Sequence, residues 1–156
     1  MADRQLNIVE KLASSKGGAW YFIHVSGRID PWLLKRTDGR LSSLPGAPVL
    51  LLQHTGAKSG KARETALTYT ADGDAFVLTA SNGGSEQHPA WYHNLRANPE
   101  CRLVVKGASG DYVAEELEGD EYERVWELAL DVYGGYAVYQ DRTGGRKIPL
   151  MRLTQA

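Results

Sequence analysis

The chain has 156 residues, a formal net charge of −1 and an apolar fraction of 42%, which is typical of one globular domain with its own core. This charge excludes a general basic field that recruits nucleic acid, so any anion-binding site has to be local. Met1–Gln5 does not begin a secretion signal and no apolar run reaches membrane-spanning length, so we expect a cytoplasmic protein. The single Cys101 excludes an internal disulfide, and its strand-like surroundings favour a buried hydrophobe over a nucleophile.

Apolar residues at helical spacing predict an amphipathic N-terminal helix that Gly17 and Gly18 end. These residues are Leu6, Val9, Leu12 and Ala13. The aromatic segment 20–23 (Trp-Tyr-Phe-Ile) follows. Packing on the rest of the protein is its favoured role, and contact with a membrane surface or a lipophilic substrate is the alternative. Within one domain we therefore separate residues 1–27, the N-terminal helix and aromatic segment, from a main body at 28–156.

The main body predicts short strands and few helices. One helix is expected to begin at Pro31 after an Asp30 cap and to stop at Gly39, and another spans 120–133. Strands are expected at 47–54, 63–71, 75–81, 101–106, 111–118 and 148–153, with turns at 72–74 and 106–110. Pro149 would place the last strand at an edge or bulge. This pattern favours an α+β fold, mostly β, built on an antiparallel barrel rather than a doubly wound sheet.

The segment 55–63 (Thr-Gly-Ala-Lys-Ser-Gly-Lys-Ala-Arg) places three cations and two glycines in a turn between two strands. Amides and cations that converge in a glycine-permitted turn are typical of an anion or phosphate site. The turn is not a Walker A loop, because one residue too few separates its glycines and a strand follows in place of a helix. A solvated hairpin turn rich in lysine is the alternative.

A second segment, residues 88–99, predicts a short helix that begins at Pro89 and closes before Pro99. Such a short helix needs an anchor, which Trp91 and Leu95 supply, and Asn94 would lie on the same side as Trp91. His88 and His93 do not share a helix face and no cysteine or carboxylate cluster is near, so no metal is expected.

Together these segments resemble the deazaflavin-dependent nitroreductase family, split-barrel proteins that use coenzyme F420. The shared pattern is Thr-Gly-x-Lys-Ser-Gly-x-x-Arg, a strand pair, Ser-x-Gly-Gly, His-Pro-x-Trp-Tyr-x-Asn-Leu and Asn-Pro, all in that order. The resemblance covers about residues 28 to 153 and implies a split β-barrel of about six strands. Family members often carry Lys after the serine of Ser-x-Gly-Gly, where this chain has Asn82.

The resemblance also implies the cofactor, reduced F420, whose tail is anionic and would bind at the cationic turn. The implied cofactor-binding residues are Lys58, Ser59, Lys61, Arg63, Ala80, Asn82, Trp91 and Asn94. The implied reaction is hydride transfer to a lipophilic acceptor, namely a quinone, a nitroaromatic or a conjugated enone. The alternatives are an oxidoreductase that binds FMN in the same barrel and a non-catalytic module that binds a flavin or a lipid.

The segment 133–140 carries Tyr133, Tyr136 and Tyr139 at three-residue spacing around a pair of glycines. Spacing alone favours a packing stripe, whereas the resemblance implies that the segment closes over the acceptor side of the cofactor, moving as a lid. One of these tyrosines, or Ser81, would then orient or protonate the acceptor. We expect a monomer or homodimer and no nucleic-acid partner. The sequence leaves open whether the N-terminal segment makes peripheral membrane contact.

Overall fold

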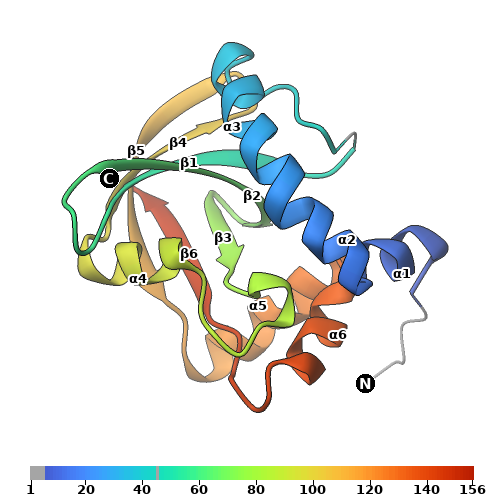
Figure 1. Cartoon of the computed structure of the whole chain (residues 1–156). Helices are drawn as coiled ribbons and strands as arrows, with labels where there is room; N and C mark the ends of the chain where they lie inside the picture. Colours follow the sequence, from blue (N-terminus) through green and yellow to red (C-terminus); the bar gives the residue numbers. More distant parts are fainter. Residues whose placement is uncertain (1–5, 45) are drawn as a thin grey trace.

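The computed structural model describes residues 6–44 and 46–156, apart from the side chains of Phe22 and Ile23, so the expectation for Met1–Gln5 and half of the aromatic segment lie outside it. Six strands form a closed antiparallel barrel in the order β1-β2-β3-β6-β5-β4 (Figure 1). They are β1 (Val49–Thr55), β2 (Ala62–Asp72), β3 (Ala75–Thr79), β4 (Glu100–Val105), β5 (Ala108–Glu116) and β6 (Leu150–Gln155). The predicted fold class, α+β and mostly β, is confirmed.

Two details of the strands differ from the sequence prediction. β5 begins at Ala108, because Lys106 and Gly107 alone form the turn, with φ of 49° and 82°. Two consecutive left-handed residues suit the right-handed twist of a tight hairpin. The edge position predicted for the last strand is wrong, because β6 lies between β3 and β5. Pro149 precedes the first residue of that strand, so its missing N–H costs no ladder bond.

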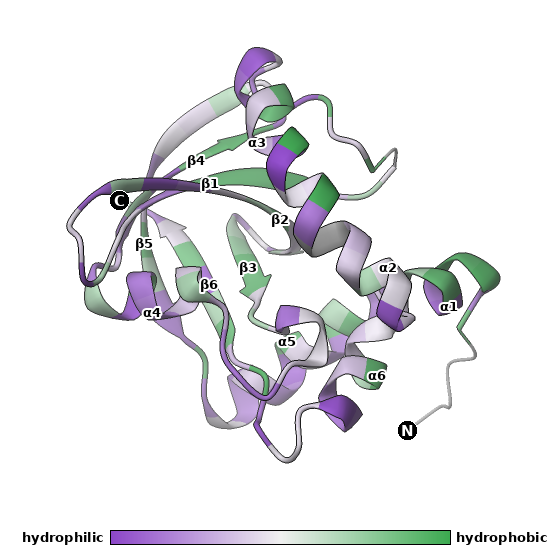
Figure 2. Ribbon diagram, viewed as in Figure 1, coloured by the Kyte–Doolittle hydropathy of each residue, from purple (hydrophilic) through white to green (hydrophobic). Residues whose placement is uncertain are grey.

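The main core fills the barrel, and Figure 2 shows hydrophobic residues along β1, β3 and β4. Leu50 and Leu52 of β1 and Leu103 of β4 are fully buried there. Helix α4 (Ala90–Ala97) adds Trp91 and Leu95 to this core, which confirms the anchors predicted for it. Cys101 is buried in the same core, and burial raises the pKa of its thiol to about 11, which fits a hydrophobe rather than a nucleophile.

One strand edge of the barrel is only partly paired. Residues 69–72 of β2 pair with β3, whereas residues 62–68 pair with β1 alone among the described strands. Backbone groups on the other side of this half-strand therefore have no strand partner. The strand order of the barrel is still closed, and we call this side of residues 62–68 the open edge of β2.

The N-terminal helices form a longer and more continuous arm than the sequence predicts. They are α1 (Ile8–Ser14), α2 (Lys16–Tyr21), the π-helical turn η1 (Phe22–Ser26) and α3 (Gly27–Arg36). Figure 1 shows α2 and α3 as one run that crosses the predicted boundary at residue 27. Among the described residues, no helix has the length and apolarity to cross a membrane.

Two predicted helix limits in this arm are wrong. The break falls at Ser15, whose hydroxyl accepts a hydrogen bond from Gly18 N–H, so the glycines lie inside α2. Gly18 is needed there for a different reason, since a Cβ at this position would clash with the Leu12 carbonyl oxygen. Asp30 is not a cap but lies buried within α3, where it accepts hydrogen bonds from Ser26 Oγ (2.7 Å) and Ser43 N–H (2.6 Å).

Helices α5 (Gly119–Val132) and α6 (Gly135–Arg142) follow β5. The helix predicted at 120–133 corresponds to α5, whose buried residues are Tyr122, Val125 and Ala129. The predicted lid is instead a packed helix, because Tyr136 and Tyr139 of α6 are buried against Ala129 and neighbouring apolar residues.

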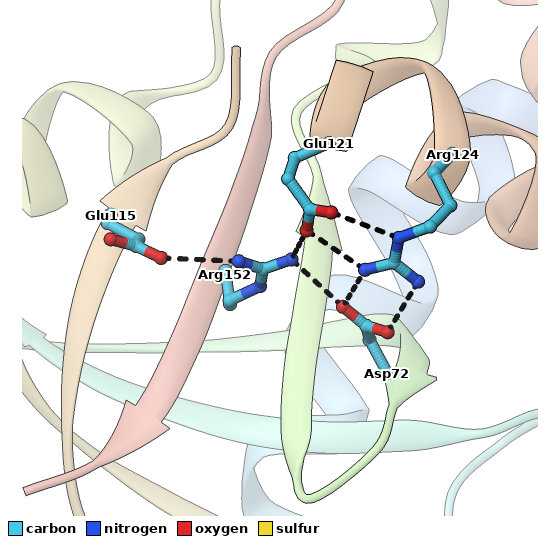
Figure 3. Close-up of polar contacts among 5 residues, drawn as sticks. All are labelled: Asp72, Glu115, Glu121, Arg124 and Arg152. Atoms are coloured by element: carbon cyan, nitrogen blue, oxygen red, sulfur yellow. Dashed lines mark hydrogen bonds and ion pairs between the residues drawn. The ribbon is translucent and has the colours of Figure 1, made fainter. Parts of the chain in front are cut away.

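An ion-pair network joins the start of α5 to the turn between β2 and β3 (Figure 3). Asp72 accepts two hydrogen bonds from Arg124 at 2.9 Å and one from Arg152 at 3.0 Å, and Glu121 contacts both guanidinium groups. The hydrogen bonds from Arg124 lower the pKa of Asp72, and those from Arg124 and Arg152 lower the pKa of Glu121 to about 2. Both carboxylates are thus held ionised in the folded chain.

These depressed pKa values predict acid sensitivity. The two ionised carboxylates stabilise the fold fully at any pH above the pKa values that they have in the unfolded chain. This stabilisation is lost as the pH falls from about 5 toward 2, through the pKa values that they have in the folded chain. The variant Asp72→Asn should therefore unfold more easily at neutral pH and lose less stability on acidification than the wild type. Urea denaturation at pH 7, 5 and 3 measures both curves. Asp111→Asn, which breaks an exposed ion pair with Arg102, is the control, and a matching effect there would contradict the role of the network.

Candidate functional site

A cavity of about 750 Å³ lies along the open edge of β2. Its walls come from α1 to α3, from β2 and β3, and from α6. The start of α4, the short 3-10 turn η2 (Asn82–Gly84), Leu44 and residues 46–49 line it as well. The lining therefore joins the N-terminal arm to the barrel along the open edge of β2.

The two faces of β2 give this cavity two chemically different sides. Side chains alternate along a strand, so Thr65 and Leu67 share one face, and Leu67 packs on the barrel core together with Trp91. Thr68 lies on the opposite face, where its hydroxyl and the Tyr136 hydroxyl are 2.9 Å apart. One side is thus continuous with the barrel mouth and the other with α6.

The cationic turn lies next to the cavity but does not line it. Lys58, Lys61 and Arg63 are exposed, and none has a carboxylate partner in the described part of the chain. Gly60 adopts φ of 65° and Gly56 is buried, so the glycines fit the tight turn predicted for them. Three cations without internal partners leave this surface positive for an anionic ligand.

Asn94 connects this turn to α4. Its Oδ1 accepts a hydrogen bond from Ala57 N–H at 2.8 Å, and its Nδ2 lies 3.2 Å from His54 Nδ1. His54 Nε2 lies 3.0 Å from Thr65 Oγ1, on the cavity wall. His54 is 6% exposed, and burial, with Arg63 nearby, lowers its pKa to about 4. The ring is therefore neutral at physiological pH.

The loop after β3 forms another wall and is held by Arg146. The guanidinium group donates hydrogen bonds to the carbonyl oxygens of Ala80, Ser81 and Ser85 and to His88 Nδ1, at 2.9–3.1 Å. Ser81 and Asn82 line the cavity, whereas Ala80 is fully buried in the barrel core. Asn82 takes a left-handed conformation with φ of 48°, which asparagine tolerates better than most residues.

The three tyrosines form one hydroxyl-bearing wall. Tyr133, Tyr136 and Tyr139 all line the cavity, and the Tyr133 and Tyr139 hydroxyls are 3.2 Å apart. Tyr139 donates to the carbonyl oxygen of Ala13 in α1, so this wall holds the N-terminal arm. Burial raises the pKa of each phenol, so all three stay protonated at neutral pH.

The structure thus divides the residues singled out in the sequence into groups. Ser81, Asn82, Trp91 and the three tyrosines share the cavity. Lys58, Ser59, Lys61 and Arg63 form an exposed turn tied to α4 by Asn94, and Ala80 lies outside the lining. Sequence reasoning missed Thr65, His54 and Arg146. The sequence pointed to only one of these residues: His54 is polar, yet it lies at a core-facing position of a mostly apolar strand. In the described residues no cluster of metal-ligating side chains occurs.

A closed six-stranded antiparallel barrel with flanking helices and a cavity beside β2 fits the split β-barrel class. A family model described as F420H(2)-dependent quinone reductase matches residues 26–155, and the chain belongs to this family. An F420H(2)-dependent quinone reductase of Mycobacterium tuberculosis is 39% identical over an alignment of 133 residues, and this alignment covers 82% of this chain and 89% of that protein.

Two solved structures are similar to this chain. The structure of an F420-H2 dependent reductase is 40% identical with a TM-score of 0.63, covering 69% of this chain and 94% of that chain. A structure described as a domain-swapped dimer is 35% identical with a TM-score of 0.66, covering 79% of this chain and 97% of that chain.

Proposed function

We propose that this chain is a reductase that transfers hydride from reduced F420 to a quinone or a related lipophilic acceptor. The observation that carries the proposal is the cavity along the open edge of β2. Tyrosines form one of its walls, and beside it lies a cationic turn without a carboxylate partner among the described residues. Membership of the F420H(2)-dependent quinone reductase family supports it.

The residues present fit the cofactor. Lys58 and Arg63, with Lys61 and the amides near Ser59, supply cations and donors for an anionic tail. Residues 62–68 of β2 offer backbone groups without a strand partner, and Trp91, Asn82 and Thr65 offer an apolar surface and polar groups for a ring. Ala80 supports this wall from the core, and Asn94 acts by fixing the turn. When bound, reduced F420 supplies the hydride.

The acceptor occupies the side of the cavity formed by α6. The tyrosines and the apolar Val9 and Ala19 of the N-terminal arm line this side and offer a surface for a lipophilic ring. Excluding water there favours hydride transfer over side reactions. Reduction of a quinone carbonyl leaves negative charge on its oxygen, which a protonated hydroxyl stabilises. Tyr136 is best suited to donate, since burial keeps its phenol protonated and its hydroxyl oxygen lies 2.9 Å from Thr68 Oγ1. Ser81 and water are the other donors.

Steady-state oxidation of reduced F420 tests the proposal. We expect F420 to bind the purified protein and its reduced form to be oxidised faster with a short-chain naphthoquinone than without protein. Chelator treatment should leave the rate unchanged. Binding of FMN instead of F420 would favour the FMN alternative, and binding of F420 without turnover of quinones, nitroaromatics or enones would favour a non-catalytic module. Either result would overturn the proposal.

We further propose that the protein acts in the cytoplasm and touches the membrane surface through its N-terminal arm, where lipophilic quinones are concentrated. Trp20 and Trp32 are each 59% exposed, so packing, the favoured prediction for the aromatic segment, does not hold for Trp20. Ile8, Val9, Leu12 and Ile29 are exposed in the same arm, which also carries Lys11, Lys16, Arg28 and Arg36. Exposed tryptophans beside cations suit an anionic bilayer interface.

Co-sedimentation with vesicles tests this contact. We expect the wild type to pellet with phosphatidylglycerol vesicles and much less with phosphatidylcholine, and the double variant Trp20→Ser/Trp32→Ser to bind several-fold less. Val113→Ser, at an exposed apolar position on β5, is the control. Equal binding by the double variant would refute the contact. The wild type and Val113→Ser could instead form dimers at high concentration while the double variant stays monomeric. That result would show that a second copy of the protein covers the exposed apolar residues of the N-terminal arm.

We also propose that residues 28–156 form the cofactor-binding barrel and that residues 1–27 are an N-terminal extension that completes the cavity. The family model begins at residue 26, and α1 contributes to the lining. A monomer or homodimer is compatible with this arrangement.

A further inference from the structure

His54 occupies an unusual place for a titratable side chain. It lies near the end of β1, 6% exposed, and one strand residue away from the cationic turn. Its two ring nitrogens face partners on different elements, Asn94 of α4 and Thr65 of β2. A buried imidazole that contacts one residue fixing the turn and another lining the cavity joins these two regions directly.

Ala57, Asn94, His54 and Thr65 form a series of hydrogen bonds, which we call the His54 hydrogen-bond chain. The direction of each bond in it follows from the first donor, the Ala57 amide. The Ala57 amide can only donate, so the Asn94 atom that receives its hydrogen bond is the oxygen, Oδ1. The other end of the amide, Nδ2, then donates to His54 Nδ1. A neutral imidazole with Nδ1 as acceptor carries its proton on Nε2, so Nε2 donates to Thr65 Oγ1. The Thr65 hydroxyl hydrogen remains for another acceptor.

Thr65 is the end of this chain that a ligand can reach. It is half-buried on the cavity wall, on the face of β2 shared with Leu67. Because His54 occupies one lone pair of Thr65 Oγ1, the rotation of the hydroxyl is restricted. A donor oriented before binding loses less entropy when a ligand accepts from it.

We propose that His54 is a positioning residue, which ties the cationic turn to the cavity and holds the Thr65 hydroxyl as a hydrogen-bond donor to an acceptor atom of the bound cofactor ring. The inference rests on the proposed function, since the ligand on this side of the cavity is the F420 ring. His54 itself does not touch the ligand. Its role is to make tail binding at the turn and ring binding at Thr65 depend on one hydrogen-bonded chain.

The tautomer of His54 tests the first half of the proposal in the unliganded wild type. Nitrogen-15 NMR of the imidazole should show a proton on Nε2, none on Nδ1, and a neutral ring down to about pH 5. A proton on Nδ1 would reverse the chain and overturn the proposal. This measurement does not involve F420, so it is independent of the proposed function.

Binding of F420, followed by tryptophan fluorescence, tests the second half. We expect His54→Phe and Thr65→Val each to weaken binding by about tenfold, because each removes the oriented donor. The double variant should bind F420 as tightly as whichever single variant binds it less tightly, since both changes break the same series of hydrogen bonds. Thr65→Ser keeps the hydroxyl and should bind like the wild type. Thr55→Val, the same change at a neighbouring residue outside the lining, should have no effect.

Melting temperatures separate positioning from simple support of the core. A positioning role predicts weaker binding by folded variants, whereas full affinity in folded His54→Phe, or additive losses in the double variant, would overturn it. If His54→Phe does not fold, Thr65→Val and Thr65→Ser still test the proposal. Equal affinities of these two variants for F420 would show that the Thr65 hydroxyl is not a hydrogen-bond donor to the cofactor. A wild type that fails to bind F420 at all would instead refute the proposed function.

Discussion

Replacing Lys58 or Arg63 by Ala should lower the affinity for F420 by about 10- to 100-fold. Hydrogen bonds to charged groups contribute roughly 1.5–3 kcal/mol, and both side chains are exposed without a carboxylate partner in the described chain. Fluorescence titration measures the change, because Trp91 lines the cavity. Lys61→Ala should have a smaller effect, since one of three cations on an exposed turn faces water.

Matched controls make this result specific. Lys147→Ala removes the same charge from an exposed lysine outside the turn and the cavity lining, and it should leave affinity unchanged. For the wild type, affinity should fall from low to moderate salt, because exposed charges are screened. Effects below twofold at both Lys58 and Arg63, or affinity independent of salt, would show that the turn is only a solvated hairpin.

Replacing Tyr136 by Phe should lower kcat and kcat/KM together by about 10- to 100-fold, the range for a donor that acts on charge formed in the transition state. The ring remains, so affinity for F420 and acceptor KM should change little. The phenol is buried, stays protonated and is 2.9 Å from Thr68 Oγ1. Tyr136→Ala should in addition raise the acceptor KM, because it removes the wall, and should lower the melting temperature by leaving a hole in the core.

Two tyrosines serve as controls for this prediction. Tyr122→Phe removes a buried hydroxyl that donates to the Ile148 carbonyl oxygen outside the cavity, so it should cost stability without lowering kcat. Tyr133→Phe breaks the contact with the Tyr139 hydroxyl and should mainly reduce stability. Normal kcat in Tyr136→Phe with several acceptors would leave Ser81 or water as the proton donor. Weaker F420 binding with unchanged acceptor kinetics would instead place Tyr136 beside the cofactor.

The barrel was largely predictable because its signals are local. Side chains that alternate along each strand and glycine-containing turns define the strands within a few residues, and their number and spacing favour a barrel. The helical limits of the N-terminal arm were not predictable in this way. Gly17 and Asp30 carry the usual signals for a helix end and a helix cap, but Ser15 and the distant Ser43 decide their roles. Contacts between elements override a propensity worth only about 1 kcal/mol.

For the site, the residue types that belong together can be read from the sequence: cations and glycines on one turn, an aromatic helix and a run of tyrosines. Which of them meet depends on how the folded chain packs. Asn94 binds the turn from 37 residues away, and Tyr136 meets Thr68 from 68 residues away. The half-paired edge of β2, along which the cavity lies, arises from the register between strands. Such contacts depend on how the strands of the barrel pair, and no local sequence pattern predicts this pairing.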